Sequence, residues 1–267
     1  MRKYLLTFFV LAGVILFSCQ QDVNSIINQA QQCRIASSNY YGGGGVNDSA
    51  TYFYDVNNKL IKVENMDGYY TYFYSGDRIV KRTYHDNMAN DLWYIDSVYY
   101  SSGNTISELV RYDYSGQWAD TIHNRILFHY QNGKMSNLTY LDYYTLWGVN
   151  YVDTMKVNVV WNGANNIDKI VYLDMGQPVD SILYQYDTNP NYFRVVHPNF
   201  FLHEPQLQLY TGLEPHFAYY YSANNVINSN MYGSFDYPVD YGLDSTNKIT
   251  SIDMGGFPYI SYKYQCP

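Results

Sequence analysis

The chain has 267 residues, with 16 Lys or Arg against 24 Asp or Glu, which gives a formal net charge of −8 at pH 7. An acidic chain that is poor in lysine is a poor candidate for binding nucleic acid or an anionic membrane surface, so we expect no nucleic-acid partner. Tyrosine occurs 34 times, and because aromatic residues favour strands, the composition predicts a β-rich protein.

Residues 1–18 have the pattern of a signal peptide. A basic head, Met1-Arg2-Lys3, precedes the uncharged run from Tyr4 to Phe17, which is shorter than the ~20 residues that a membrane-spanning helix needs. The run ends in Leu16-Phe17-Ser18-Cys19, which resembles the lipobox of bacterial lipoproteins. In that family the cysteine is acylated, so the resemblance implies lipidation at Cys19 and contact with a membrane through the lipid anchor. The alternative is an ordinary secretory signal with a chance cysteine.

No aspartate follows Cys19 directly, and we therefore predict an outer-membrane location, on either the periplasmic or the cell-surface face. Removal of residues 1–18 would leave 14 of the 16 basic residues and all 24 acidic ones, a net charge of −10. Residues 19–45 are polar and include the run Gly42–Gly45, so we predict a flexible tether there. Residues 46–267 are predicted to form a single domain.

Two further cysteines stand near the ends of the mature chain, at Cys33 and Cys266. An oxidising cell envelope allows a disulfide between them, and the alternative is two free, buried thiols. Closing so long a loop would stabilise the fold by about 4–5 kcal/mol in the chain-entropy description. We predict the disulfide, and this structural use argues against a catalytic cysteine.

After residue 46 a unit of aromatic strand, turn and aliphatic strand recurs. Its first copies span residues 52–63 and 72–82, with turns at Asn57-Asn58 and Gly76-Asp77. Such residues tolerate the positive φ that tight hairpin turns require, so each unit is predicted to be a β-hairpin. Further copies occur near residues 128–135, 159–163, 219–227 and 243–249.

A dipeptide of aspartate and serine or threonine precedes several of the aromatic segments. These side chains can bond nearby backbone amides, and we predict that they start strands. The alternative, a row of aspartates that binds cations, needs several oxygens to converge on each ion. The dipeptides are Asp48-Ser49, Asp96-Ser97, Asp120-Thr121, Asp153-Thr154 and Asp180-Ser181.

Repeated hairpins form one extended antiparallel sheet, and a sheet of more than about ten strands must curl, split or close. We predict an all-β fold, an extended and strongly curved antiparallel sheet that is partly rolled like half a barrel. The apolar, proline-containing segment 193–213 breaks the pattern of hairpins. We predict that it folds back and fills the concave face.

The segment Tyr52–Leu60 is similar to the tyrosine–aspartate (YD) repeats of RHS-type proteins. The layout of the whole chain resembles an uncharacterised family of Bacteroidetes-type outer-membrane lipoproteins with degenerate YD-like hairpins. This resemblance covers most of the mature chain and implies an all-β domain tethered to the outer membrane, with no assigned activity. It rests on Cys19, Cys33, Tyr186-Asp187 with Asn191, Tyr221–Val226 and Tyr262–Cys266.

The sequence contains no nucleophile elbow, phosphate loop or dinucleotide fingerprint. His197, His203 and His216 lie near each other, but His203-Glu204-Pro205 is not the zinc motif H-E-x-x-H. We predict no catalytic residue, no metal and no cofactor.

Most tyrosines are explained by strand propensity. Trp93, Trp118 and Trp147 fall in or beside the segments that lead into strands, where binding residues concentrate, and they are our candidate ligand-binding residues. Trp161 lies within the strand register and is predicted to belong to the core.

The leading hypothesis is a non-enzymatic, lipid-anchored, monomeric envelope module that binds a glycan or an envelope protein through its aromatic-rich face or loops. The alternative is a carrier that holds an apolar ligand in the concave face, with residues 193–213 as a lid. A hydrolase is the third hypothesis, because 24 carboxylates could include an acid–base pair.

Overall fold

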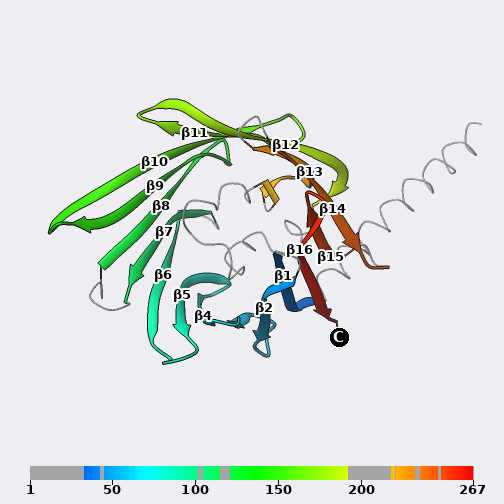
Figure 1. Ribbon diagram of the computed structural model, residues 1–267, viewed down its shortest axis with the longest axis horizontal. Coiled ribbons are helices and arrows are strands. Elements are labelled where there is room, and N and C mark those ends of the chain that lie inside the picture. Colours follow the sequence, from blue (N-terminus) through cyan, green and yellow to red (C-terminus); the bar gives the residue numbers. More distant parts are fainter. Residues whose placement is uncertain are drawn as a thin grey trace, which may run out of the picture.

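The computed structural model describes residues 33–42, 45–101, 105–114, 121–191, 218–219, 221–231, 235–245 and 248–266. They form sixteen β-strands in one closed barrel (Figure 1). Each strand pairs in antiparallel orientation with the strands that precede and follow it in the sequence, and β1 also pairs with β16 to close the ring.

The strands are β1 Arg34–Gly42, β2 Gly45–Tyr54, β3 Leu60–Glu64, β4 Gly68–Ser75, β5 Arg78–Asp86, β6 Leu92–Tyr100, β7 Ile106–Asp113, β8 Thr121–Gln131, β9 Lys134–Leu146, β10 Val149–Trp161, β11 Ile167–Asp174, β12 Gln177–Pro190, β13 Asn224–Met231, β14 Phe235–Leu243, β15 Ile249–Met254 and β16 Phe257–Gln265.

The prediction of an all-β antiparallel sheet built from hairpins is confirmed, but the sheet is not a half-barrel. The closing strand is β1, which lies within the segment 19–45 that we assigned to the tether. Its backbone pairs with β16 from Arg34↔Gln265 to Tyr40↔Ile260 and with β2 on its other side. Closure satisfies backbone groups that the two edges of an open sheet would leave unpaired.

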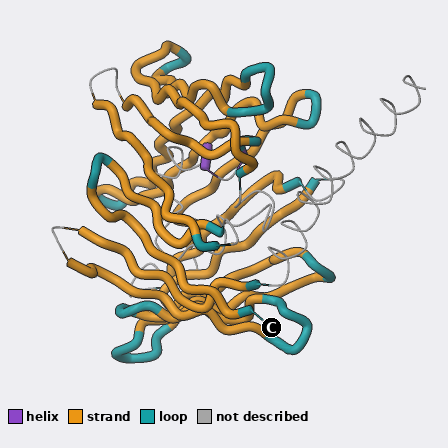
Figure 2. Tube along the Cα trace, turned by 90° about the vertical axis from the view of Figure 1, so that its right-hand side faces the viewer, coloured by secondary structure: helices purple, strands orange, loops and turns teal. Residues whose placement is uncertain are grey.

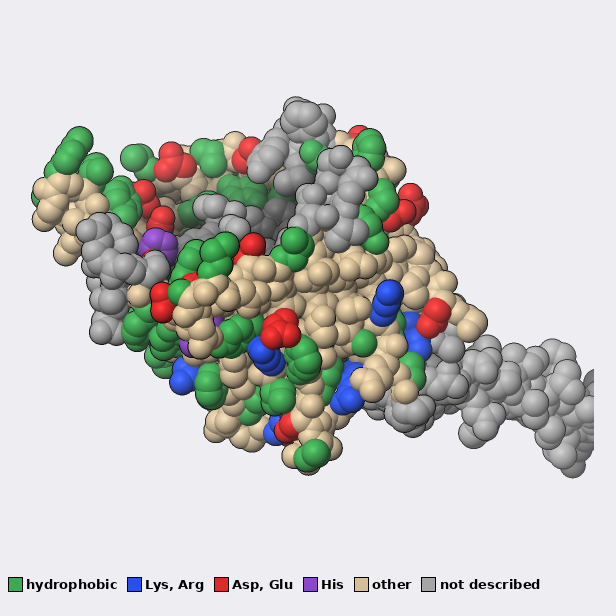
Figure 3. All heavy atoms as spheres, turned by 60° about the horizontal axis from the view of Figure 1, so that its bottom comes forward, with side chains coloured by type: hydrophobic (Ala, Val, Ile, Leu, Met, Phe, Trp, Pro, Cys, Tyr) green, Lys and Arg blue, Asp and Glu red, His purple; other side chains and the backbone are tan. Residues whose placement is uncertain are grey.

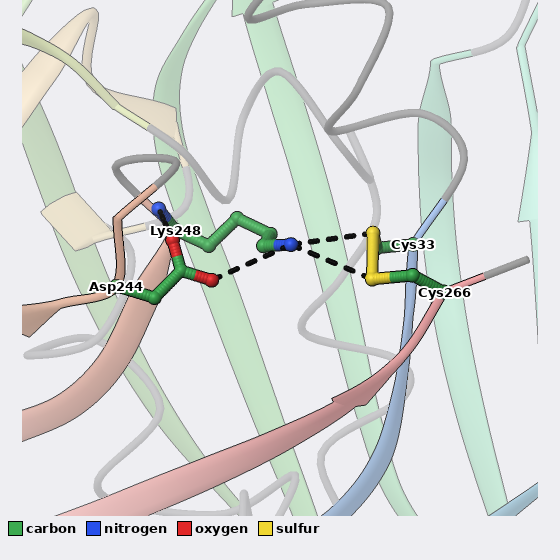
Figure 4. Close-up of a disulfide and its surroundings, with 4 residues drawn as sticks. All are labelled: Cys33, Asp244, Lys248 and Cys266. Carbon is green, nitrogen blue, oxygen red and sulfur yellow. Dashed lines mark hydrogen bonds and ion pairs between the residues drawn. A yellow bond between two sulfur atoms is a disulfide. The ribbon is translucent and has the colours of Figure 1, made fainter.

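The predicted disulfide between Cys33 and Cys266 is confirmed, and it joins the chain at this closing seam. Cys33 directly precedes β1 and Cys266 directly follows β16. Figure 4 shows the ammonium group of Lys248 pointing at the disulfide, with Nζ 3.3 Å from the sulfur of Cys33 and 3.5 Å from that of Cys266. The same Nζ lies 3.4 Å from a carboxylate oxygen of Asp244. The disulfide thus holds the first and last strands together, and Lys248 connects it to the β14–β15 turn.

Antiparallel neighbours place successive turns at alternate ends of the barrel. We call the end that holds Cys33 and Cys266 the proximal rim and the opposite end the distal rim. Figure 2 shows the turns, in teal, joining the orange strands. Several predicted turn positions have the positive φ that hairpins require, among them Asn58 at 64°, Gly76 at 60° and Asn132 at 53°.

Side chains alternate between the interior and the outer wall, as in β4, where Tyr70 and Tyr72 are buried and Phe73 is exposed. Buried Ile, Leu and Val residues from strands all around the ring form one cluster, which only the interior can hold. Burial of each such side chain contributes roughly 1.5–3 kcal/mol. Members with no exposed surface are Val63, Leu138, Val157, Ile167, Ile170, Ile182 and Val226.

Part of the chain between β12 and β13 lies inside the barrel. Figures 1 and 2 show the short helical turn at Ala218–Tyr219 within the ring of strands, and both residues belong to the core cluster. This corrects the hairpin predicted near residues 219–227, because β13 begins only at Asn224. The side-chain amide of Asn191 donates to the carbonyls of Tyr219, at 2.7 Å, and Ser222, at 3.1 Å. The predicted filling segment, residues 193–213, lies outside the described residues.

The recurring aromatic residue has a structural role at the proximal rim. It ends an even-numbered strand and donates a hydrogen bond to the carbonyl of an aliphatic residue at the start of the preceding strand. A Lys or Arg just before that aliphatic residue lies with its cationic group 4.8–5.6 Å from the aromatic ring centre, an attractive arrangement. The donor–acceptor pairs are Tyr54–Ile35, Tyr74–Leu60, Tyr100–Ile79, Trp161–Met135 and Tyr264–Ile249.

A buried ion cluster stands in the barrel interior. The register places Asp96 directly opposite Arg82 on one side and Arg111 on the other. The Nε of Arg82 lies 2.7 Å and the Nε of Arg111 2.6 Å from the carboxylate oxygens. Burial would raise the pKa of Asp96, but the two arginines outweigh that effect and lower it. Asp96 therefore stays ionised and compensates part of the buried positive charge.

These positions correct the prediction that the dipeptides start strands. Asp96 lies in the middle of β6 and Asp153 within β10, while Asp48 and Asp180 are the fourth residues of β2 and β12. The predicted bond to a neighbouring amide does form at Asp48 and Asp180, each of which accepts from the next residue's backbone N–H at 2.7 Å.

Candidate functional site

The distal rim presents large apolar side chains at its turns. In four described connections there, between β3 and β4, β5 and β6, β9 and β10, and β11 and β12, one such side chain is largely exposed to solvent, and at the fifth it is Phe257, the first residue of β16. At the described proximal turns and strand ends, Val56 is fully exposed and Leu243, the last residue of β14, is 51% exposed. The exposed fractions at the distal rim are Met66 64%, Met88 101%, Trp147 91%, Met175 98% and Phe257 75%.

Two of these distal turns contain a residue that the turn conformation disfavours. At the proximal rim, Asn132-Gly133 joins β8 to β9 with φ angles of 53° and 76°. At the distal rim, Trp147-Gly148 adopts 50° and 78°, and Met175-Gly176 adopts 45° and 81°. Asparagine tolerates this left-handed region, whereas a bulky side chain makes it a genuine outlier. Turn stability therefore does not explain Trp147 or Met175.

The β9–β10 hairpin extends beyond the neighbouring strands (Figure 1). Trp147 lies in its turn, between the end of β9 and the start of β10. Its strands pair with each other from Asn158↔Asn137 to Val149↔Leu146. Pairing with β8 reaches only Asp142, however, and pairing with β11 reaches only Lys156. Residues 143–152 of this projecting part carry no charged side chain. Leu146, Val149 and Val152 are exposed along it, so the projection is an apolar surface.

A pocket of about 610 Å³ lies between the base of this hairpin and the adjoining ends of β7 and β8. The rings of Tyr144 and Tyr151 stack across the hairpin beside it, with their centres 5.6 Å apart. Asp113 and His123 line the opposite side. The pocket therefore combines flat aromatic surface with a few polar groups, as small-molecule sites do.

The three candidate tryptophans are not brought together as one site in the described structure. Trp147 is the exposed tip of the hairpin, and Trp93 is a half-exposed residue near the distal end of β6 whose ring lies 6.1 Å from that of Tyr84. Trp118 lies outside the described residues. Trp161 packs against the core, as predicted.

The methionines of the distal rim were missed because methionine has no turn preference and no recognised motif. A signal does exist in the sequence, since the same residue type recurs where the proximal turns have Asn-Gly or Gly-Asp. It is seen at Asn65-Met66, Asn87-Met88, Asp174-Met175-Gly176 and Asp253-Met254-Gly255.

The outer wall of the barrel carries charge. On the face shown in Figure 3, acidic and basic side chains are scattered over the outer surface. Arg125 and Glu108 pair there, at positions that alternate with the buried Ile126 and Leu109. Lys62 and Glu64 form a second, partly exposed pair. The barrel thus has a largely apolar interior, and its outer wall carries these charges together with exposed apolar side chains such as Phe53, Phe73 and Leu183.

Residues that could hold a metal do not converge in the described structure, where no group of three or more His, Cys, Asp or Glu side chains is close enough. His197, His203 and His216 lie outside the described residues. Asp187 accepts hydrogen bonds from the backbone N–H of Asn189, at 2.9 Å, and of Asn225, at 3.2 Å.

No helix in the described ranges is long and apolar enough to cross a membrane.

No family model and no curated protein matches the chain significantly. Similar solved structures include a porin-like protein from Bacteroides uniformis, 11% identical with a TM-score of 0.49, and one from Bacteroides vulgatus, 9% identical with a TM-score of 0.38; each match covers 86% of this chain and 98% of the other. A Tc holotoxin pore from Photorhabdus luminescens, carrying the TccC3-D651A mutation, is 10% identical with a TM-score of 0.37 over 82% of this chain and 12% of that one. At these values the similarities carry no argument about function. The chain's own geometry defines the class, a closed, antiparallel all-β barrel with a packed apolar interior.

Proposed function

We propose that the protein is a lipid-anchored, non-enzymatic envelope module that binds a protein partner through its distal rim. The observation that carries this proposal is the exposed apolar side chain at each described distal turn. Exposed apolar surface at positions where it does not stabilise the fold is typical of interaction sites. Three of the five side chains are methionines, whose flexible thioethers adapt to protein surfaces and offer no flat ring for a sugar.

The position of the tether supports an orientation in which the distal rim faces away from the membrane. The proposed anchor at Cys19 is connected to the barrel through Cys33, which lies at the proximal rim. Fourteen residue steps separate the two cysteines, which corresponds to at most about 50 Å of extended chain. The proximal rim would then be the end nearer the membrane, with the distal rim facing away from it.

The outer wall supports a barrel that stands on the membrane and does not pass through it. Membrane-spanning barrels have an apolar outer band and a polar interior, and charges on their lipid face are costly. Here the fully buried aliphatic residues face inward, whereas the Arg125–Glu108 and Lys62–Glu64 pairs face outward. The lipid would thus be the membrane contact.

Site-specific photo-crosslinking in intact cells tests the proposal. A photoreactive residue at Met88 or Met175 should give the same crosslinked protein, whereas the same residue at Val56 or Asn132, on the proximal rim, should not. Crosslinks from the proximal positions alone would contradict the proposal. Radiolabelled fatty acid, incorporated by the wild type and not by Cys19→Ala, tests the anchor separately.

A second candidate function is the binding of a small apolar ligand in the pocket beside the hairpin. The stacked Tyr144 and Tyr151 rings favour it. Native mass spectrometry of the purified protein should then reveal a bound small molecule that is lost from Tyr151→Ala. An apo mass alone would exclude a tightly bound ligand there.

A further inference from the structure

The projecting part of β10 has one backbone edge with which no described residue pairs. Residues 149–155 pair with β9 on one side. On the other side, pairing with β11 begins only at Lys156↔Leu173, and no described residue pairs with 149–155 there. Residues 149–154 are all exposed, so side chains on both faces of this segment reach solvent.

This edge has few of the devices that usually protect free strands, and Asp153 is its one charged residue. Exposed edges are normally blunted by lysine, proline or a β-bulge. The segment 149–155 contains neither Lys nor Pro, and its pairing with β9 runs without a shift in register. It contains Val149, Tyr151 and Val152, residue types that favour strands.

We propose that the edge of β10 at residues 149–155 receives an extended segment of the protein partner as an added β-strand. This inference rests on the proposed function and specifies how the distal rim binds. Main-chain hydrogen bonds to the edge would supply affinity, while side chains on alternate positions would supply specificity. Lipid cannot be the occupant, because hydrocarbon offers nothing to the backbone N–H and C=O groups.

The charges indicate the chemistry of the added strand. Asp142 and Asp153 flank the uncharged part of the hairpin, and residues 135–155 contain no Lys or Arg. Opposite charges on directly paired residues of neighbouring strands are favourable. The added strand should therefore alternate apolar residues with polar ones and carry Lys or Arg opposite Asp153.

A second copy of the chain fits this edge less well than a partner does. Two β10 edges that pair about a two-fold axis run antiparallel, so their barrels point in opposite directions. The distal rims would then face each other and the two proximal rims, each with its tether, would lie at opposite ends. One membrane could not easily hold both anchors.

A peptide selection tests the inference. The detergent-solubilised mature chain is used to select from a phage-displayed library of random linear peptides. We expect enrichment of peptides that alternate apolar residues with Lys or Arg. Bound peptide should slow amide hydrogen exchange in residues 149–155 and leave residues 156–161 unchanged. No enrichment, or protection elsewhere only, overturns the inference.

Two variants make the test specific. Val152→Lys with Thr154→Lys places charge beside the free edge and should weaken peptide binding at least tenfold. Asn158→Lys lies on the same face of β10 where β11 already covers the edge, and it should bind like the wild type. Equal binding by all of these proteins overturns strand addition.

The outcome separates this inference from the proposed function. If Trp147→Asn abolishes capture of the crosslinked partner while the double lysine variant retains it, the distal rim binds but strand addition is wrong. If neither variant changes capture, both proposals fail. If the wild type sediments as a dimer and the double lysine variant as a monomer, the edge binds a second copy of the chain. That result would overturn the addition of a strand from a different protein.

Discussion

Replacing Trp147 by asparagine should stabilise the protein, although it removes the largest side chain of the projecting hairpin. Trp147 has a φ of 50° and is 91% exposed. A left-handed conformation costs an L-residue with a bulky side chain about 1–2 kcal/mol, and asparagine relieves part of that cost. Little buried surface is lost in exchange. We therefore expect the free energy of unfolding to rise by about 0.5–1 kcal/mol.

Urea denaturation followed by far-UV circular dichroism of the backbone measures this change in the free energy of unfolding. A reciprocal substitution at the proximal rim serves as the control. Asn132 has nearly the same φ, 53°, in a turn of the same length at the proximal rim. Asn132→Trp should lower the free energy of unfolding by a similar amount. The reasoning is refuted if Trp147→Asn destabilises the protein by more than about 1 kcal/mol, since the indole would then contribute packing to the fold.

Three further perturbations test the interior and the seam. Asp96→Asn removes the acidic partner of two buried arginines and should destabilise by about 3–5 kcal/mol in denaturant titration, whereas Asp77→Asn, at an exposed ion pair, should change stability by less than about 1 kcal/mol. Changing both Cys33 and Cys266 to serine opens a loop with a sequence separation of 233. The chain-entropy relation predicts a loss of stability of about 5 kcal/mol as an upper estimate, and thermal unfolding with and without reductant measures this loss. Because the pKa of Asp96 is lowered from 3.8, its contribution to stability is present above about pH 4 and is lost as the pH falls below that. Because burial raises the pKa of Tyr72 above 10.0, the contribution of Tyr72 to stability does not change below pH 10 and is lost as the pH rises beyond it.

The pH profile has its own controls. Asp96→Asn should flatten the acid limb, and Tyr72→Phe should reduce the alkaline limb, each measured by the midpoint of urea unfolding against pH. Absorbance at the tyrosinate band should show a fraction of tyrosines that ionise only on unfolding. Complete ionisation near pH 10 in the folded protein would contradict the buried positions.

The hairpins and the disulfide followed from local chemistry, whereas closure of the barrel did not. The residue type alone predicts the positive φ of turn residues such as Asn58 and Gly76. The closing strand, Arg34–Gly42, alternates weakly and ends at glycines, so it could not be distinguished from a tether. Its strand conformation depends on pairing with β16, whose residues lie more than 200 positions away in the sequence.

The buried ion cluster and the exposed side chains of the distal rim could not be read from the sequence, for different reasons. Asp96 belongs to a dipeptide that recurs elsewhere, and only the register of β5, β6 and β7 reveals that it faces Arg82 and Arg111. Trp147 could be singled out as a candidate by its position beside a strand. Met175 was missed although methionine recurs at such turns, because its exposure follows from which end of the barrel its turn occupies.

The central claim is that the distal rim binds the partner. The most direct measurement is the affinity of the crosslinked partner for the double variant Trp147→Asn, Met175→Asn, with Val56→Asn at the proximal rim as the control. Hot-spot residues contribute 2 kcal/mol or more, so we predict that the double variant binds at least about 30-fold more weakly and the control binds like the wild type. A double variant that retains wild-type affinity would contradict the account.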